Sequence, residues 1–451
     1  SRASISPSAP QDPRMLSLLT FHGAAAALVS NGAVLHSGRG AGVLRMNVAG
    51  DIGIPCEGEC ALPKYPKMPA SVHPGVVTGQ ALVDLLDHAK KNGYAIPAVN
   101  CVTSSSVNAC LEAARKNDAP IIIQFSSGGS QFYAGKGLDN TNFKAAIAGA
   151  VSGAFHVRAM AEQYGVPVIL HTDHCAKQLL PWLDGMLSAS ERYYAAHGEP
   201  LFSSHMIDLS EEPMDENIEI CASYLERMKK MDMLLEMELG ITGGEEDGVN
   251  NEDVNPEDLY TKPEEVWEVH ETLSKIDSKF TVAAAFGNVH GVYAPGNVRL
   301  DPEILGRSQV YIADKLGQPE GSQPVSFVFH GGSGSDIADI KKAISYGVVK
   351  MNIDTDTQWS YWNGIKQYEA KNHDYLQQQI GNPDGDDKPN KKYYDPRMPL
   401  RAAEETTVER LEQCFQDLNC VGILGLGEMS EPENVLEPEL MKGPRKGALP
   451  V

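Results

Sequence analysis

The chain has few cysteines, no long apolar run and a marked shortage of positive charge. Its eight cysteines are scattered over 451 residues, which argues against a disulfide framework and favours a reducing compartment. No run of 18 apolar residues occurs, so no transmembrane helix is predicted. The 38 basic and 60 acidic residues give a formal net charge of −22, which disfavours nucleic acid and anionic membranes as partners. An anionic ligand must therefore be held by a local site.

The N-terminal segment differs in composition from the rest of the chain. Its first 50 residues contain four arginines and many alanines, serines and glycines, but only one acidic residue, Asp12. This composition predicts an organelle transit peptide within residues 1–65 and a plastid as the destination, with mitochondrion and cytoplasm as alternatives. The other interpretation is a disordered tail. Cys56 and Cys60, in the sequence CEGEC, form either a redox or metal clip or a pair without function.

From about residue 75 the sequence alternates between short β-branched runs and amphipathic stretches. Such alternation predicts βαβ units with a parallel sheet, and eight strands predict a closed (β/α)₈ TIM barrel in the α/β class. We expect one catalytic domain over residues 72–425 and a loop-like tail over 426–451. The predicted strands are residues 95–100, 120–126, 167–173, 201–208, 234–240, 280–286, 326–332 and 348–354.

Nearly every predicted strand ends in a polar side chain that is able to take part in chemistry. A barrel places its active site at the C-terminal ends of its strands. We therefore expect residues spread over more than 250 positions to meet at one mouth. The strand-end residues are Asn100, Ser126, Asp173, His174, Asp208, Glu238, Asn288, His290, His330, Asn352 and Asp354.

Three of these strand-end residues are histidines: His174, His290 and His330. Three imidazoles and an open fourth position are typical of a catalytic zinc site. His171 points to the same face of its strand but is interpreted as a core or supporting histidine. Asp208 and Glu238 either orient the histidines, hold a second ion or form plain ion pairs; the sequence leaves these alternatives open.

Gly-rich turns follow the sixth and seventh strands, at residues 287–291 (GNVHG) and 331–335 (GGSGS). Glycine lets backbone N–H groups approach an anion, and the loops after strands 7 and 8 are the usual phosphate site of a barrel. Residues 243–248 (GGEEDG) form a predicted flexible lid that carries two candidate bases, Glu245 and Glu246. Asp173, next to His174, is placed for proton transfer.

The motifs HTDHCAK, SSHMIDLSEE, GGEEDGV, FGNVHGVY, FHGGSGS, KMNIDTDTQW and NKKYYDPR resemble those of the class II fructose-1,6-bisphosphate aldolases, in their longer bacterial-type subgroup. The resemblance covers residues 72–422. It implies reversible cleavage of fructose 1,6-bisphosphate into dihydroxyacetone phosphate and glyceraldehyde 3-phosphate through a zinc-stabilised enediolate. It also implies a role in glycolysis, gluconeogenesis or the Calvin cycle.

The resemblance also implies a role for each matching residue. His174, His290 and His330 resemble the zinc ligands, and Asp208 and Glu238 resemble the ligands of a second metal position. Asp173 resembles the residue that moves the proton of the carbon-4 hydroxyl, and Glu246 resembles the base that deprotonates dihydroxyacetone phosphate. The remaining residues resemble substrate contacts: Asn100 and Ser126, then Gly291, Gly331, Gly332, Ser333, Asn352, Ile353, Asp354 and Thr355 for one phosphate, and Lys391 and Arg397 for the other.

Two further implications concern ions and partners. A monovalent cation, K⁺ or Na⁺, is expected near Val289, Gly291 and Gly331. Arg397 is expected to reach into the active site from a partner subunit, so the resemblance implies a homodimer.

Lysine-dependent aldolase chemistry is not favoured, because Lys350 is the only lysine within a predicted strand and is interpreted as structural. The remaining alternatives are a tagatose 1,6-bisphosphate aldolase, which differs in the stereochemistry at carbon 4, and a barrel that binds metal and phosphate without catalysis.

Overall fold

The computed structural model describes residues 66–240, 242–246, 249–251, 259–290 and 299–425. The segment 1–65, with Cys56 and Cys60, and the tail 426–451 lie outside the described residues. Among the helices that are described, none is both long and apolar enough to cross a membrane.

The central sheet has nine strands, and every pairing within it is parallel. Eight of these strands coincide with the eight predicted from the sequence, and β1 is additional. Their order in the sheet is β1 (Gly75–Val76), β4 (Pro167–Thr172), β3 (Ile121–Phe125), β2 (Ile96–Asn100), β12 (Val348–Asn352), β11 (Phe327–Phe329), β9 (Phe280–Ala284), β6 (Leu234–Leu239) and β5 (Ser204–Ile207).

The strand order is that of a TIM-like barrel, but the sheet is not a closed ladder, so the prediction of closure is wrong. Closure requires β4 to pair with β5, and β1 instead occupies the first half of the free edge of β4, with Gly75 opposite Pro167. Beyond β1, Ser203 N–H donates to Leu170 O over 2.8 Å. Side chains continue the link, because His171 Nδ1 lies 2.8 Å from Ser204 Oγ.

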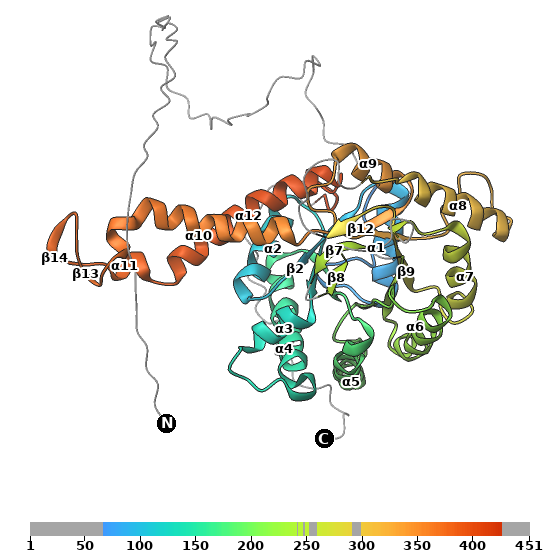
Figure 1. Cartoon of the computed structure of the whole chain (residues 1–451), viewed down its shortest axis with the longest axis horizontal. Coiled ribbons are helices and arrows are strands. Elements are labelled where there is room, and N and C mark those ends of the chain that lie inside the picture. Colours follow the sequence, from blue (N-terminus) through green and yellow to red (C-terminus); the bar gives the residue numbers. More distant parts are fainter. Residues whose placement is uncertain (1–65, 241, 247–248, 252–258, 291–298, 426–451) are drawn as a thin grey trace, which may run out of the picture. The chain divides into compact units, whose positions relative to one another are not determined.

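Helices alternate with the strands as the sequence predicts, and Figure 1 shows them around the sheet. They are α1 (Gly79–Asn92), α2 (Ser104–Lys116), α3 (Ser127–Ala134), α4 (Lys144–Tyr164), α5 (Leu180–His197), α6 (Met214–Met228), α7 (Pro263–Leu273), α8 (Glu303–Leu316), α9 (Ile337–Ser345), α10 (Thr355–Leu376), α11 (Lys391–Tyr394) and α12 (Arg397–Asp417). Short 3₁₀ turns are η1 (Thr141–Phe143), η2 (Lys177–Leu179) and η3 (Lys229–Met231).

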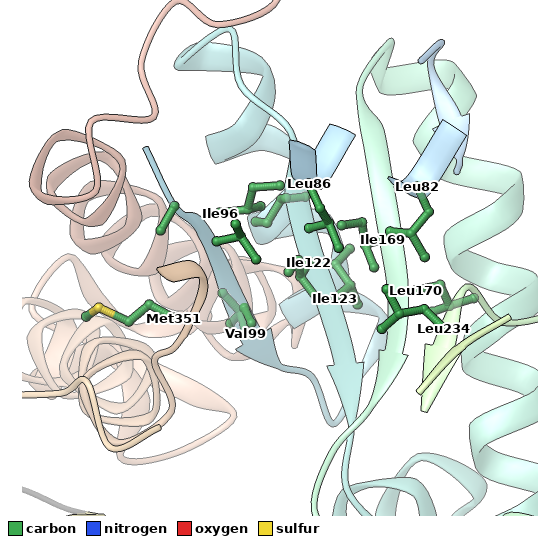
Figure 2. Packing of buried hydrophobic residues seen from close by; sticks show 14 of the residues in the cluster. Leu82, Leu86, Ile96, Val99, Ile122, Ile123, Ile169, Leu170, Leu234 and Met351 are labelled. Atoms are coloured by element: carbon green, nitrogen blue, oxygen red, sulfur yellow. The ribbon is translucent and has the colours of Figure 1, made fainter. Parts of the chain in front are cut away.

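The apolar core lies inside and around the curled sheet (Figure 2). Helix α1 buries Leu82, Leu85, Leu86 and Ala89, which recur at helical spacing along one face. Leu82 and Leu86 line one small interior cavity together with side chains of β3, β4, β6, β9, β11 and β12. Helix α1 therefore covers the N-terminal end of the strands and leaves their C-terminal ends for polar residues.

Residues 355–417 form a helical arm in which α10 and α12 pack side by side and end in β13 (Ile380–Asn382), β14 (Gly385–Pro389) and α11. In Figure 1 this outer end lies away from the sheet. The helices approach closely, because a Cβ on Gly364 would lie 2.2 Å from Ala402 O. Within the segment 381–396, which is polar and rich in proline and glycine, β14 pairs with β13 as an antiparallel hairpin.

Candidate active site

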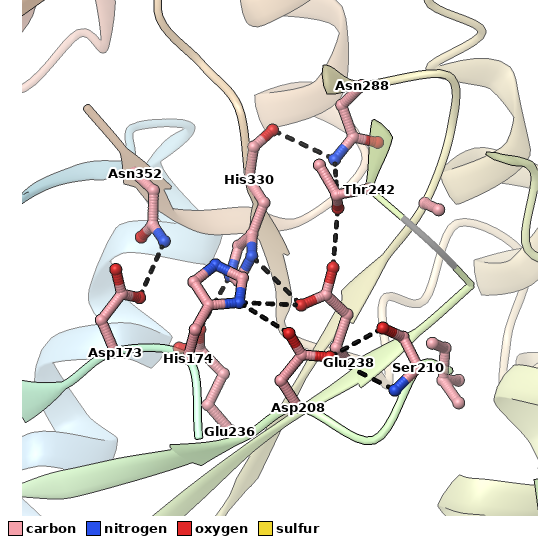
Figure 3. Close-up of polar contacts among 12 residues, drawn as sticks. Asp173, His174, Asp208, Ser210, Glu236, Glu238, Thr242, Asn288, His330 and Asn352 are labelled. Carbon is pink, nitrogen blue, oxygen red and sulfur yellow. Dashed lines mark hydrogen bonds and ion pairs between the residues drawn. The ribbon is translucent and has the colours of Figure 1, made fainter. Parts of the chain in front are cut away.

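Polar residues from six strand ends lie close together at one end of the sheet, as the sequence predicts (Figure 3). The group consists of Asp173 and His174 after β4, Asp208 after β5, Glu238 in β6, His330 after β11, Asn352 at the end of β12 and Asn100 at the end of β2. Ser126 follows β3 and caps α3, with its side chain accepting from Gly129 N–H.

His174, Glu238 and His330 form the one group of candidate metal ligands found within the described part of the chain. Their ligand atoms all lie within 4.8 Å of one another, and the two imidazole rings are 4.7 Å apart between centroids. The structure therefore brings together two of the three predicted histidines. His290 is the last residue of β10 (Val289–His290), but its side chain lies outside the described atoms, so its place in the cluster stays a prediction.

The chemistry of this cluster fits a zinc ion. Nitrogen and carboxylate oxygen are ligands that zinc accepts, and two ligand atoms of a tetrahedral zinc site lie about 3.4 Å apart. Glu238 Oε2 lies 3.5 Å from His330 Nδ1 and accepts no hydrogen bond from the residues that the structure describes. The other oxygen, Oε1, accepts from Thr242 Oγ1 over 2.7 Å. Thr242 thus fixes the carboxylate so that Oε2 faces the histidines.

Asp208 contacts His174, which favours an orienting role among the alternatives that the sequence left open. Its Oδ2 lies 2.8 Å from His174 Nδ1, and its Oδ1 accepts from Ser210 Oγ over 2.7 Å. Although burial alone would raise the pKa of Asp208, the His174 and Ser210 hydrogen bonds hold it below its usual range. An ionised Asp208 accepts a hydrogen bond from Nδ1–H and thereby fixes the orientation of the His174 ring.

His330 is surrounded by negative charge. It is 1% exposed, and its Nε2 lies 3.0 Å from Glu236 Oε1. Burial alone would lower the pKa of His330, but the neighbouring Glu238 and Glu236 carboxylates raise it to about 9. The pocket therefore favours a positive charge between these groups, whether it is a proton or a metal cation.

Asp173 is buried and held by two amides. Asn100 Nδ2 donates to Asp173 Oδ2 over 2.8 Å, and Asn352 Nδ2 donates to Oδ1 over 3.2 Å. Gln124 in turn donates to Asn100 Oδ1. Asp173 thus has a fixed orientation beside His174. Sequence reasoning missed Gln124 and Thr242; the signal for Gln124 was a polar residue inside an apolar strand, and Thr242 had no comparable signal.

The predicted flexible lid is a hairpin in the structure. β7 (Gly243–Glu246) pairs with β8 (Val249–Asn251), and Glu246 lies opposite Val249. β10 pairs with β7 on its other side, with Val289 opposite Gly243. The side chains of Glu245 and Glu246 lie outside the described atoms, so the base role of Glu246 stays a prediction. The pairing explains why the segment forms strands, because its backbone groups bond to two neighbours.

The predicted phosphate-binding segments lie side by side. Gly332 N–H donates to Asn352 O over 3.2 Å, and Asp356 N–H donates to Ser333 Oγ over 3.4 Å. Gly331 has φ 63°, and a Cβ there would lie 2.2 Å from Val289 O, so only glycine fits. Helix α10 begins at Thr355, after Ile353 and Asp354, and helix N-termini attract anions. Gly291 lies outside the described residues.

The structure does not bring Lys391 and Arg397 to this cluster. Both belong to the helical arm, at the start of α11 and of α12. The Arg397 side chain is 88% exposed and pairs with Asp395 over 2.6 Å.

Lys350 is enclosed within the sheet, which agrees with its structural interpretation. Its Nζ donates to Glu236 Oε1 over 2.7 Å and to Oε2 over 2.8 Å. The interior cavity beside it measures about 20 Å³, which holds a water but no sugar phosphate. A substrate carbonyl therefore has no access to the Lys350 amine.

Comparison with known proteins gives consistent matches. The family described as "Fructose-bisphosphate aldolase class-II" matches residues 80–423. The chain is 61% identical to a fructose-bisphosphate aldolase of Edwardsiella ictaluri, over 78% of this chain and 98% of that protein. It is 59% identical to the class 2 enzyme of Escherichia coli K12, with the same coverage. A crystal structure of the Campylobacter jejuni fructose-bisphosphate aldolase matches with a TM-score of 0.71 at 56% identity, covering 78% of this chain and 97% of that one.

These relatives correct the predicted location. They come from bacteria, and a further relative at 55% identity comes from the fungus Aspergillus oryzae. None of these organisms has plastids, so the prediction of a plastid is wrong. It rested on the arginine and serine content of the leader, and such a composition does not specify a compartment.

We predict that Zn²⁺ raises the melting temperature of protein treated with a chelator, because an ion that binds only the folded state stabilises it. At a free concentration 100 times its dissociation constant, the gain is about 2.7 kcal/mol. His330→Ala removes a ligand and should abolish this gain in a thermal unfolding assay. His156→Ala, in α4, where the ring contacts Asn108 of α2 and not the cluster, should retain the gain. A full zinc-dependent gain in the His330 variant would contradict the metal assignment.

Proposed function

Because the chain belongs to the class II fructose-bisphosphate aldolase family, whose members are metal-dependent lyases, we propose that it cleaves fructose 1,6-bisphosphate reversibly at a zinc centre held by His174, His290 and His330. The observation that carries this proposal is the cluster of His174, His330 and Glu238, the last two of them buried, with its ligand atoms within 4.8 Å of one another. We assign catalysis to residues 72–425, with 1–65 as an extension and 426–451 as a tail.

When bound, zinc supplies Lewis-acid stabilisation of the negative charge that develops on the substrate oxygens. The side chains of the site orient the substrate and move its protons. Asp173 accepts and returns the proton of the carbon-4 hydroxyl. The two amides that bond to Asp173 support this role, because they leave the carboxylate little freedom to rotate. Glu246, which lies on the β7–β8 hairpin, removes a proton from dihydroxyacetone phosphate.

Backbone amides and glycines hold the phosphate of dihydroxyacetone phosphate. Gly291, the segment Gly331–Ser333 and the segment Asn352–Thr355 form this site, supported by their adjacency and by the N-terminus of α10. A monovalent cation, K⁺ or Na⁺, binds the carbonyls near Val289, Gly291 and Gly331. Without a second ion, Asp208 orients His174; when a second divalent ion binds, Asp208 and Glu238 are its ligands. Asn100 and Ser126 contact the substrate.

Lys391 and Arg397 bind the second phosphate, and Arg397 does so in the active site of a partner subunit of a homodimer. Two features of the arm support the dimer. Arg397 extends into solvent beyond its own site. Helix α10 exposes two tryptophans, Trp359 at 58% and Trp362 at 54%, and exposed aromatic side chains of this kind are typical of protein interfaces.

We predict that chelation abolishes cleavage of fructose 1,6-bisphosphate and that Zn²⁺ or Co²⁺ restores it. Borohydride added with substrate should leave activity intact, because Lys350 is inaccessible. A coupled assay of dihydroxyacetone phosphate release measures both effects. Tagatose 1,6-bisphosphate, tested in parallel, distinguishes the alternative substrate. Activity that survives chelation and is lost on borohydride treatment would refute the proposal, and bound zinc without turnover would identify a non-catalytic barrel.

Glu246→Ala should lower turnover by about 10²- to 10⁴-fold, the usual contribution of a general base, while the zinc content stays at the wild-type level. Steady-state kinetics and metal analysis of the same preparation test this. Glu245→Ala removes the same charge one residue earlier and is the matched control. Equal turnover in the Glu246 variant and the wild type would exclude the base role.

Mixing two inactive variants tests the contribution of Arg397 across the dimer. Arg397→Ala and Glu246→Ala, each of low activity, should together recover about a quarter of wild-type activity, because half of the randomly formed dimers are mixed and each has one complete site. Failure of the mixture to exceed its components would place Arg397 outside the partner's site.

The exposed tryptophans of α10 test the dimer interface separately. Trp359→Asp with Trp362→Asp should give monomers in light scattering, whereas Val310→Asp, at an exposed position on α8, should not.

A further inference from the structure

Glu236 lies two residues before Glu238 on β6, so both carboxylates project from the same face of the strand into the sheet interior. Glu238 is one of the candidate metal ligands. Glu236 lies on the other side of it from Thr242 (Figure 3) and lines the interior cavity of the sheet. Both are almost fully buried, at 1% and 2% exposure. A buried carboxylate is destabilising unless cations or hydrogen-bond donors surround it. Glu236 has no assigned role in the proposed reaction, so its burial requires a separate explanation.

The partners of Glu236 come from across the sheet. Lys350 of β12 donates to both carboxylate oxygens, over 2.7 and 2.8 Å. His330 Nε2 lies 3.0 Å from Oε1, and His171 Nε2 lies 3.6 Å from Oε2. β12 and β6 are not neighbours, because β11 and β9 lie between them. The Lys350–Glu236 pair therefore spans the interior of the sheet directly beneath His330.

This arrangement determines which His330 nitrogen faces the candidate metal position. An ionised carboxylate only accepts hydrogen bonds. His330 Nε2 is therefore the protonated nitrogen, and it donates its hydrogen bond to Glu236. Nδ1 then presents its lone pair on the opposite side of the ring, where Glu238 Oε2 lies 3.5 Å away. A carboxylate on the far nitrogen of a metal-binding histidine fixes the tautomer and the orientation of the ring.

Lys350 holds this carboxylate in place. Its ammonium group occupies both oxygens, so Glu236 cannot rotate away from His330 without breaking two charged hydrogen bonds. Lys350 is itself 4% exposed, so solvent does not compete for the contact. The pair is thus fixed on one side by β12 and on the other by β6, while His330 at the end of β11 lies between them.

We propose that Glu236 and Lys350 are positioning residues for the metal centre: Glu236 orients His330 so that Nδ1 faces the ion, and Lys350 fixes Glu236. The inference rests on the proposed function only in taking His330 as a zinc ligand. It gives neither residue any contact with the substrate.

Glu236→Gln tests the proposal on the full-length protein. Glutamine has nearly the same shape, but it carries no charge, and its NH₂ group donates where the second carboxylate oxygen accepts from Lys350. The dissociation constant for Zn²⁺ should rise about 10- to 100-fold, measured by competition with a chromophoric chelator. The visible absorption spectrum of the Co²⁺-loaded variant should change as well, because it reports the geometry of the ligands and not catalytic activity.

Two further proteins separate positioning from general packing. Thr281→Val alters the same interior cavity without touching the Glu236–His330 contact, so its zinc affinity and cobalt spectrum should match the wild type. Replacing the pair by apolar residues, Glu236→Leu with Lys350→Met, removes both buried charges and retains the fold. This double variant should lose zinc affinity as Glu236→Gln does, and it provides the test if the single variant does not fold.

Wild-type zinc affinity and an unchanged cobalt spectrum in Glu236→Gln, or in the double variant, would overturn the positioning role. Equal losses in Thr281→Val would also overturn it, since they would assign the effect to packing. Failure of the proposed function has a different signature, because the wild-type protein would then bind zinc at His330 without cleaving fructose 1,6-bisphosphate.

Discussion

Glu236, Glu238 and Asp208 surround His174 and His330 at the C-terminal ends of the strands, and this attraction between carboxylates and imidazoles is the constraint on which the site depends. Carboxylates inside a sheet are destabilising unless positive charge or hydrogen-bond donors accompany them. Each carboxylate also accepts from a second partner. The partner is Lys350 for Glu236, Thr242 for Glu238 and Ser210 for Asp208. The histidines are therefore held in fixed orientations by groups from several strands, which is the arrangement that a metal centre needs.

The sheet supplies the rigidity for this arrangement, although its hydrogen-bond ladder does not close. The edge of β4 pairs with β1 over its first half, and contacts through Ser203 and Ser204 link its second half to β5. The break lies between the strands that precede His174 and Asp208. His174 and Asp208 bond to each other over 2.8 Å, and Asp208 N–H donates to Cys175 O over 3.0 Å, so contacts within the site join these two edges where the regular ladder is interrupted.

Much of this organisation was predictable from local patterns. The eight strands, the buried face of α1 and the polar strand ends all follow from the periodicity of apolar residues and from where that periodicity stops. The hairpins β7–β8 and β13–β14 were not predicted, because their sequences are polar and rich in glycine, and only pairing with a neighbouring segment stabilises them as strands. The contacts of Gln124 and Thr242 were missed for a related reason: a single polar side chain does not indicate its partner.

Local sequence was enough to predict the order of strands and helices, the type of ligand atom at each strand end and the family resemblance, because these depend on residues close together in the chain. Only the folded chain shows that Glu236 meets Lys350 from a strand three positions away in the sheet, that Asp208 bonds to His174, and that Arg397 lies away from the candidate metal ligands of its own chain. Such pairings depend on how the sheet curls and where α12 projects, and these are set by packing among segments distant in sequence.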